Sequence, residues 1–348
     1  MTVLLEKLCS AASVSGDEGE VRKIVQEELA GVVEVITVDA LGNVLATKKG
    51  RGRDRLRVMV SAHMDEVGFM ITGDDKEGIF RFDVVGSLDA SELVGKSVTV
   101  AKARTIGVVG FKPIHLTTAA ERRQEVAISG LRIDIGGGAN VKVGDRGTFA
   151  PNFIRIGRGA NQVFRSKALD NRIGVATLIE LLQNPPATID LLAAFTTQEE
   201  IGVRGAQVAA YHFEPDLAIA LDVSPAQDLP HWQGEENVRY NTRLGAGPAI
   251  YTADGGTLSD PRLLEFVLTT ARKYRIPHQI RQAGGGGTDV RAIHKTRAGV
   301  PSISISVPTR YTHTAAGLLR RSDWRNMQSL VSHTLADLRR GLLLQERA

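Results

Sequence analysis

Residues that can hold a metal or move a proton follow four short apolar stretches of this chain. The stretches span residues 56–62, 191–196, 217–221 and 302–307. Runs this short and uniformly apolar are typical of strands buried on both faces of a parallel sheet. In open α/β sheets, ligands bind beyond the carboxyl ends of the strands. The pattern therefore predicts one site, assembled from the residues that follow the stretches: His63, Asp65, Glu199, Glu200, Asp222 and His313.

The side chains in this set are imidazoles and carboxylates, with no cysteine, and such donors suit the divalent metals of hydrolytic enzymes. Asp65 lies two residues after His63, so on an extended strand end both side chains face the same side. A ligating imidazole usually donates its second N–H to a carboxylate, a role open to Asp65. Taken alone, however, this pair would be better explained if His63 were an ordinary histidine of the surface or the core, without a metal.

The remaining acids each have two interpretations. Asp170 precedes an expected helix, so it could be an N-cap or a carboxylate whose two oxygens bridge two metals. Glu199 and Glu200 could lie on a surface loop. Two adjacent acids at the end of a buried strand are costly, however, unless something neutralises them. In that setting Glu200 could bind a metal while Glu199 acts as a general base toward water. Asp222 also needs a polar site at its strand end.

A glycine-rich segment at residues 284–289 precedes His313 in the chain. Its four glycines allow a ligand to approach the backbone closely, although a flexible turn before a helix is the alternative. The segment matches neither a phosphate-binding loop nor a dinucleotide fingerprint. We therefore expect a substrate-binding loop with Gly287, Thr288 and Asp289 as contact residues. The chain has no His-Glu-x-x-His and no Gly-x-Ser-x-Gly motif, so neither a helix-borne zinc site nor a serine elbow is expected.

Periodicity indicates how these residues are positioned. Ser15 and Glu18 resemble a capping box at the start of a helix. Apolar residues at helical spacing predict helices at residues 21–29, 172–182, 202–211, 261–274 and 324–343. Between residues 68 and 162, short β-rich runs up to 153–156 alternate with glycine turns, which is typical of a small all-β barrel. The prediction is an α/β domain with a mixed, largely parallel sheet flanked by helices, formed by residues 1–67 and 163–348, with residues 68–162 inserted as a barrel.

The composition is that of an ordinary soluble globular protein, with 43% hydrophobic and 24% charged residues in 348. No apolar stretch approaches the roughly 20 residues needed to cross a bilayer, and the N-terminus lacks a secretory signal. The lone Cys9 fits a reducing compartment, so we expect a cytoplasmic protein without membrane contact. The net charge is +4, but the 43 basic residues are scattered among 39 acidic ones, and we expect no nucleic-acid partner.

Taken together, these segments resemble the M42 family of metal-dependent aminopeptidases, which includes glutamyl and tetrahedral aminopeptidases. The resemblance extends over nearly the whole chain and rests on Ala-His-Met-Asp-Glu-Val-Gly at residues 62–68, Ala-Leu-Asp-Asn-Arg at 168–172, Thr-Gln-Glu-Glu-Ile-Gly at 197–202, Leu-Asp-Val at 221–223, Gly-Gly-Gly-Thr-Asp at 285–289 and Pro-Thr-Arg-Tyr-Thr-His at 308–313. Two positions depart from the family pattern. Asn171 stands where a second Asp is frequent, and Ile114 where proline is common.

The resemblance implies a zinc-exopeptidase-like fold and two divalent metal ions that share Asp170 as a ligand. The ions would be zinc or cobalt, with manganese as a further possibility. His63 and Asp222 would complete one metal site, and Glu200 and His313 the other. Glu199 would be the general base and Asp65 the support of His63. The resemblance also implies short peptide substrates, a dimerisation role for the barrel and assembly into a homo-oligomer, up to a twelve-subunit tetrahedral shell.

Alternatives remain open at this point. A related two-metal amidohydrolase, a carboxypeptidase or a deacylase, would use the same donors but accept substrates blocked at the amino end. A glycosidase would use two carboxylates but would have no need of His63, Asp222 and His313. A peptide-binding protein with a structural metal would bind without turnover.

Overall fold

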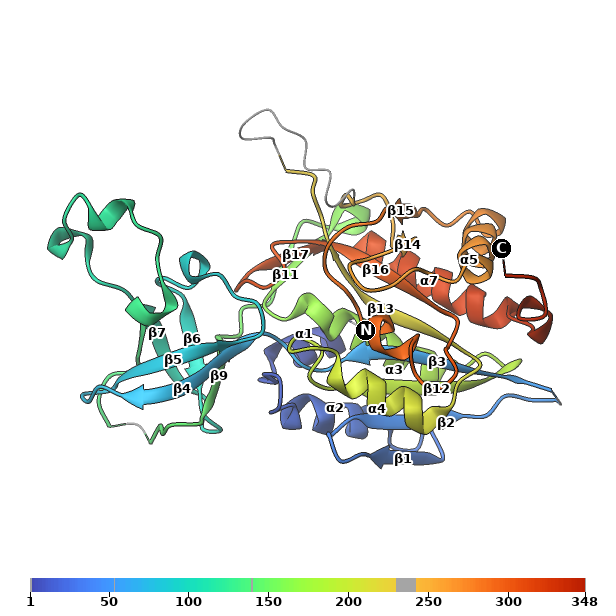
Figure 1. The fold of residues 1–348 in the computed structure, drawn as a ribbon, viewed down its shortest axis with the longest axis horizontal. Helices are drawn as coiled ribbons and strands as arrows, with labels where there is room; N and C mark the ends of the chain where they lie inside the picture. The colour runs from blue at the N-terminus through green and yellow to red at the C-terminus, as the bar shows by residue number, and fades with distance from the viewer. Residues whose placement is uncertain (1, 53, 139, 230–241, 348) are drawn as a thin grey trace.

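A computed structural model describes residues 2–52, 54–138, 140–229 and 242–347 of the chain. Two parts are evident in Figure 1: a large α/β part and a small β-barrel that projects from one end of it. The barrel is formed by one continuous segment of the middle of the chain. The α/β part combines strands and helices from both ends of the chain.

The large sheet contains eleven strands, most of them in one continuous path. In order along this path they are β1 Val35–Val38, β2 Val44–Lys48, β12 Ile189–Thr196, β3 Leu56–His63, β13 Leu217–Pro225, β16 Ser302–Arg310, β17 Gly317–Arg320, β11 Val163–Ser166 and β10 Ile154–Ile156. The strands β14 Ala249–Tyr251 and β15 Gln279–Arg281 pair beside β16. The four central strands β12, β3, β13 and β16 are parallel. They are the four apolar stretches of the sequence.

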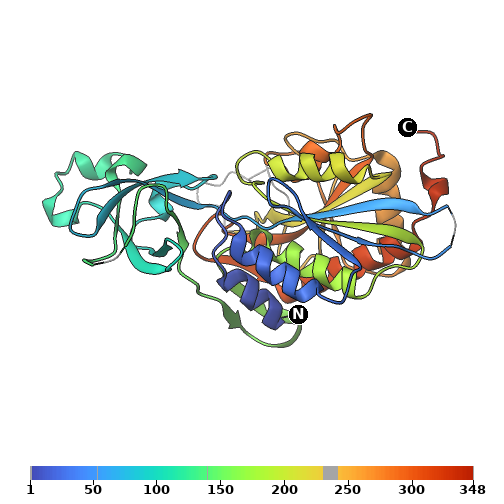
Figure 2. The same cartoon turned by 90° about the horizontal axis from the view of Figure 1, so that it is seen from below.

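Helices cover both faces of this sheet, which explains the uniform apolar character of its central strands (Figure 2). One face carries α1 Thr2–Ser10, α2 Gly19–Leu29, α3 Leu169–Gln183 and α7 Arg321–Asp337. The other face carries α4 Arg204–Phe213 and α6 Val290–Ile293. The helix α5 Pro261–Lys273 packs against α7 and β14. No helix of the described residues is long and apolar enough to cross a membrane.

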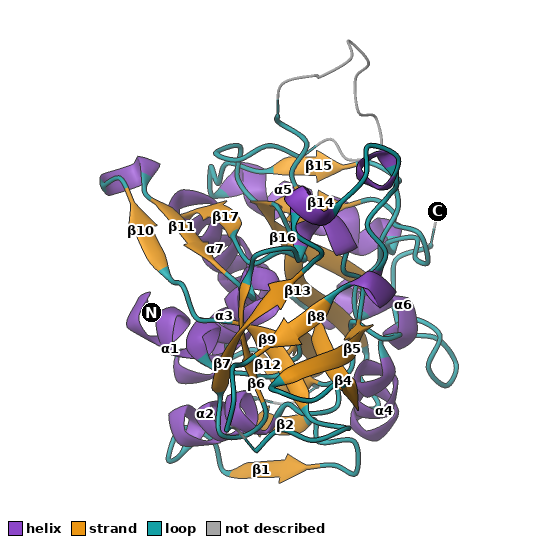
Figure 3. Ribbon diagram, turned by 90° about the vertical axis from the view of Figure 1, so that its left-hand side faces the viewer, coloured by secondary structure: helices purple, strands orange, loops and turns teal. Residues whose placement is uncertain are grey.

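The inserted barrel is closed, and Figure 3 views the molecule from its side. Around the barrel the strands are β4 Gly68–Asp74, β5 Ile79–Val85, β8 Arg132–Asp134, β7 Thr105–Gly110, β6 Ser97–Val100 and β9 Arg146–Phe149. Its core is centred on Phe69, which packs edge-on against Phe82 and Phe149 at ring-centroid distances of 5.3 and 5.6 Å.

Three local predictions are wrong. The run at residues 153–156 forms β10, but β10 pairs with β11 in the large sheet and not with the barrel. The last helix ends at Asp337 because the chain turns at Leu338 into a short 3₁₀ turn. Ser15 and Glu18 form no capping box: the Ser15 hydroxyl donates to Asp65, and Glu18 makes no side-chain cap on α2.

Candidate metal centre

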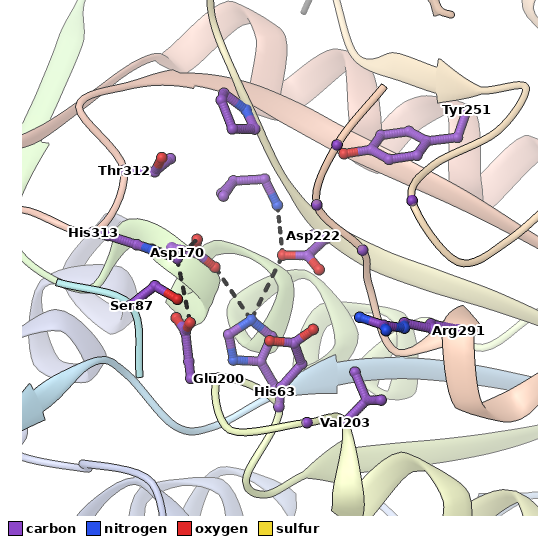
Figure 4. A pocket seen from close by; sticks show the side chains of 18 of the residues that line it. His63, Ser87, Asp170, Glu200, Val203, Asp222, Tyr251, Arg291, Thr312 and His313 are labelled. Carbon is purple, nitrogen blue, oxygen red and sulfur yellow. Dashed lines mark hydrogen bonds and ion pairs between the residues drawn. The ribbon is translucent and has the colours of Figure 1, made fainter. Parts of the chain in front are cut away.

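The carboxyl ends of the central strands bring most of the predicted residues together. Figure 4 shows five of them around one site: His63, Asp170, Glu200, Asp222 and His313. His63 is the last residue of β3 and pairs in register with Thr196, so the Glu199–Glu200 turn follows directly beside it. Ala220 of β13 pairs with Ser61 of β3, which places Asp222 level with His63. The sequence suggested that Asp222 follows its strand. In the structure β13 continues to Pro225, so Asp222 lies within the strand. His313 lies in the loop that follows β16, and this loop places it at the same site.

Two groups of side chains could each hold a metal ion, and they share Asp170. In the first, His63 Nε2 lies 3.2 Å from Asp170 Oδ1 and 3.6 Å from Asp222 Oδ1. In the second, His313 Nε2 lies 3.5 Å from Asp170 Oδ2 and 3.3 Å from Glu200 Oε2. Each oxygen of Asp170 thus faces a different histidine. This is the arrangement that a carboxylate bridging two ions requires.

Asp170 is not an N-cap. Asp170 and Asn171 have non-helical dihedral angles inside α3, so its regular turns begin after them. The side-chain oxygen of Asn171 accepts a 3.0 Å hydrogen bond from the N–H of Gly174 in these turns. The Asn171 amide also donates to the Leu221 carbonyl at 2.7 Å, on the strand that carries Asp222. An aspartate at this position would lack that donor. Asn171 therefore ties the backbone next to Asp170 to β13, a role that the sequence did not reveal.

Asp65 has more partners than the sequence suggested. Its carboxylate lies 3.5 Å from His63 Nδ1. It also accepts hydrogen bonds from the backbone N–H groups of Glu199 and Glu200, at 3.0 and 3.1 Å, and from the Ser15 hydroxyl at 2.6 Å. These donors and His63 together hold the pKa of the fully buried Asp65 carboxyl below its usual value, although burial by itself would raise it. Asp65 is therefore a buried carboxylate that favours its ionised form and positions His63 and the Glu199–Glu200 turn.

Burial and close contact shift the pKa values of the carboxylates and imidazoles in this cluster. Burial raises the pKa of Glu200 to about 8 and that of Asp222 to about 6, and it raises the pKa of Glu199 well above its usual value. Burial would lower the pKa values of the histidines, but nearby carboxylates outweigh it. They raise the pKa of His313 to about 9 and that of His63 well above 6.5. Protons thus occupy positions for which metal ions would compete.

A direct test of fit comes from Glu200. Its Oε1 atom is buried, and no described residue makes a hydrogen bond with it. A buried carboxylate oxygen without a partner is costly, and a cation would supply the missing interaction. The residues present therefore fit a pair of divalent ions. Cys9, in contrast, is buried in α1, where burial raises the pKa of its thiol to about 12, so it is inert.

The site opens into a cavity of about 510 Å³. Of the predicted substrate-binding residues, Gly287 lines it. Thr288 and Asp289 are almost fully buried behind the lining. The Thr288 hydroxyl shares a 2.7 Å hydrogen bond with Ser304 of β16, and Asp289 accepts one at 2.8 Å from Thr196 at the end of β12. Both residues anchor the glycine-rich loop to the sheet.

Comparison with known proteins identifies the relatives of this chain. A profile of the family described as M42 glutamyl aminopeptidase matches residues 42–330. The chain belongs to the M42 aminopeptidase family. Lysyl aminopeptidase from Pyrococcus furiosus is 32% identical over 97% of each chain. This M42 chain is therefore a peptidase hydrolase.

Solved structures agree with this assignment to the M42 family. The TET aminopeptidase from a marine sediment archaeon of the Thaumarchaeota is 34% identical and superposes with a TM-score of 0.92, covering 99% of this chain and 98% of the other. The TET1 peptidase of Pyrococcus horikoshii, which can assemble into a tetrahedron or a large octahedral shell, is 29% identical with a TM-score of 0.82, covering 97% and 99%. M42 peptidases depend on metal ions, in line with the donor groups described above.

Proposed function

We propose that this M42 peptidase removes N-terminal amino acids from short peptides with a pair of divalent ions and with Glu199 as the general base. The observation that carries the proposal is the position of Asp170, whose two oxygens face His63 and His313 in two separate donor groups. His63, Asp170 and Asp222 would hold one ion, and Asp170, Glu200 and His313 the other. Zinc, cobalt and manganese all suit such donors.

When bound, the two ions would supply a lowered pKa for water and a polarised scissile carbonyl. The protein's own contribution is proton transfer. Burial raises the pKa of Glu199 well above that of an ordinary glutamate, which moves it toward the range in which a carboxylate can both accept and return a proton. Glu199 would take the proton of the attacking water and deliver it to the leaving amine. Asp65 would fix the backbone of Glu199 during both transfers.

The test uses aminoacyl-p-nitroanilides with a free or an acetylated amino group. Chelator-treated protein is measured before and after addition of zinc, cobalt or manganese. We expect metal-restored hydrolysis of the free-amine substrates alone. Hydrolysis of the acetylated substrates would favour a related deacylase instead, and binding of peptides without turnover would favour a non-catalytic role.

We also propose that the inserted barrel, from β4 to β9, acts as a dimerisation domain within a homo-oligomer. Support comes from the barrel's exposed apolar residues: Ile106, Phe111, Ile114 and Leu116 are 72, 41, 73 and 61% exposed. An apolar surface of this kind is typical of an interface between chains. Ile114, which replaces a common proline, belongs to this surface. A cytoplasmic location stays a prediction.

A further inference from the structure

Two arginines line the cavity beside the metal centre, and they differ in what holds them. Arg281 is fully buried. It donates to the carbonyls of Ala253 at 2.9 Å and Gly285 at 2.5 Å, and its guanidinium lies 4.3 Å from the ring centroid of Tyr251. Arg291 is exposed, and among the described residues no carboxylate or carbonyl accepts a hydrogen bond from its guanidinium. Figure 4 shows this side chain reaching into the cavity toward the centre.

The backbone around Arg291 is shaped to hold its aliphatic stem. A Cβ atom on Gly256 would lie 2.6 Å from Cγ of Arg291, and one on Gly287 would lie 3.3 Å from its Cδ. Only glycines leave the stem this room. α6, which carries Arg291, is fixed to the sheet by Thr288 and Asp289. The stem of Arg291 thus leaves a segment that is anchored to the sheet, and its guanidinium has hydrogen-bonding groups available at the cavity.

The charges of the lining favour an anionic substrate group. Its acidic residues are Asp170, Glu199, Glu200 and Asp222, and all four belong to the metal centre or serve as the proposed base. Outside this centre, the cationic side chains of the described lining are Arg281, which two carbonyls hold, and Arg291. A cationic substrate side chain would find no free acid there, whereas a carboxylate would meet a guanidinium whose planar fork matches it.

We propose that Arg291 is a specificity-determining residue that binds a carboxylate of the peptide substrate. The proposal rests on the proposed aminopeptidase function. The family includes both glutamyl and lysyl aminopeptidases, so membership alone does not give the preferred N-terminal residue. That preference depends on the residues that line this chain's own cavity. The carboxylate could come from an acidic N-terminal side chain or from the C-terminus of a very short peptide. Both sources present the same chemistry to the guanidinium.

The first arm of the test compares the N-terminal side chains. Metal-loaded protein is assayed with p-nitroanilides of Glu, Leu and Lys, which carry no other carboxylate. We expect kcat/KM to follow the order Glu, Leu, Lys. Because hydrogen bonds between charged groups are stronger than those between neutral groups, Arg291→Gln should lower the Glu-to-Leu ratio about tenfold or more. Arg291→Lys should recover part of the ratio, and Arg291→Glu should shift preference toward Lys.

The second arm compares Leu-Leu with its C-terminal amide, so that only the terminal carboxylate differs. Loss of discrimination in Arg291→Gln in either arm supports the proposal and identifies the source of the carboxylate. Unchanged discrimination in both arms overturns it. Arg272→Gln is the matched control, since Arg272 is an exposed helical arginine that pairs with Glu265 on α5, away from the cavity.

A binding measurement separates this inference from the proposed function. If metal-loaded protein hydrolyses no aminoacyl substrate, the proposed function fails, and calorimetry still tests Arg291. Stronger binding of L-glutamate than of L-glutamine, reduced at least tenfold in Arg291→Gln, would support carboxylate recognition. Binding that is equal for the two amino acids and unchanged in Arg291→Gln would refute it.

Discussion

The side chain of Asp65 accepts a 3.0 Å hydrogen bond from the backbone N–H of Glu199. It therefore joins the end of β3, which carries His63, to the turn after β12, which carries the proposed base and a metal ligand. The adjacent N–H of Glu200 donates to the other oxygen of the same carboxylate at 3.1 Å. One buried side chain thus sets the distance between two strand ends of the site.

Asp65→Asn should weaken metal binding. The substituted amide would turn an N–H₂ group toward a backbone N–H donor, and the Glu199–Glu200 turn would shift. Loss of such a supporting contact typically costs about 10- to 100-fold in metal affinity or activity. Competition with a fluorescent chelator measures the affinity. Asp323→Asn is the matched control, since buried Asp323 also accepts two backbone N–H groups, those of Gly245 and Gly247, but lies on α7 and outside the metal centre. Equal affinities in both variants would contradict the role of Asp65.

Glu199→Gln should leave metal binding intact and remove most turnover. Glutamine has the same shape but cannot accept the proton of water, and general-base catalysis typically contributes about 10²–10⁴-fold. Metal content and kcat are measured on the same preparation. A variant with full metal content and the activity of the unmodified protein would exclude Glu199 as the base.

Glu66→Gln should destabilise the whole fold. Glu66 is buried between Lys167 and Arg172, at 2.8 and 3.0 Å, and Thr148 of the barrel donates to its second oxygen. Arg172 in turn donates to the Met64 carbonyl at 2.6 Å, next to His63. Removing the one negative charge would leave two buried cations, at a cost of about 3–5 kcal/mol.

Urea unfolding of chelator-treated protein measures this loss. Glu265→Gln is its control, because Glu265 pairs with Arg272 on the surface, where such pairs contribute about 0–1 kcal/mol. A Glu66→Gln protein as stable as the control would show that the fold does not depend on the charge of Glu66 to compensate Lys167 and Arg172.

The metal-free protein should lose stability as the pH rises. Burial raises the pKa of Glu200 to about 8 and that of Asp222 to about 6. Burial alone would lower the pKa of His313, but Glu200 and Asp170 outweigh it and raise it to about 9. In each case the folded state keeps a proton that the unfolded chain releases earlier, so stability falls between about pH 4 and pH 9.

Thermal unfolding at pH 6 and pH 9, with and without metal, measures this dependence. The midpoint of the metal-free protein should be lower at pH 9. Added metal should reverse the trend, because ions take the place of the protons. A metal-free midpoint that rises from pH 6 to pH 9 would contradict these pKa directions.

The sequence predicted those parts of the site that depend on short-range patterns. His63 and the Glu199–Glu200 pair follow buried strands, and burial of a parallel strand is readable from its uniform apolar character. The run at residues 153–156 was misplaced because its pairing partner, β11, follows a turn that local pattern does not specify. Ser15 looked like a cap because its partner, Asp65, lies 50 residues away.

Arg291 gave no signal of its own among 43 basic residues. Its place at the cavity depends on Gly256 and on the strands to which the start of α6 is anchored. Gly256 and these strands are distant from Arg291 in the sequence. The glycine-rich segment just before it was the only available clue, and it indicated Thr288 and Asp289, which lie behind the lining.

The barrel surface gives a separate prediction. Ile114→Asp would place a charge in the proposed interface and should reduce the mass of the assembly in solution, measured by light scattering after size exclusion. Val3→Asp is a suitable control, since Val3 is also exposed, at 76%, but lies on α1. An unchanged mass for Ile114→Asp would place the interface elsewhere.

The number of ions bound per chain tests the central claim most directly. Chelator-stripped protein is titrated with cobalt while bound metal and hydrolysis of a free-amine p-nitroanilide are followed together. We expect two ions per chain in the unmodified protein, with activity dependent on them, and loss of binding at both positions in Asp170→Asn. A single bound ion with full activity, or undiminished binding in Asp170→Asn, would contradict the proposed pair of ions.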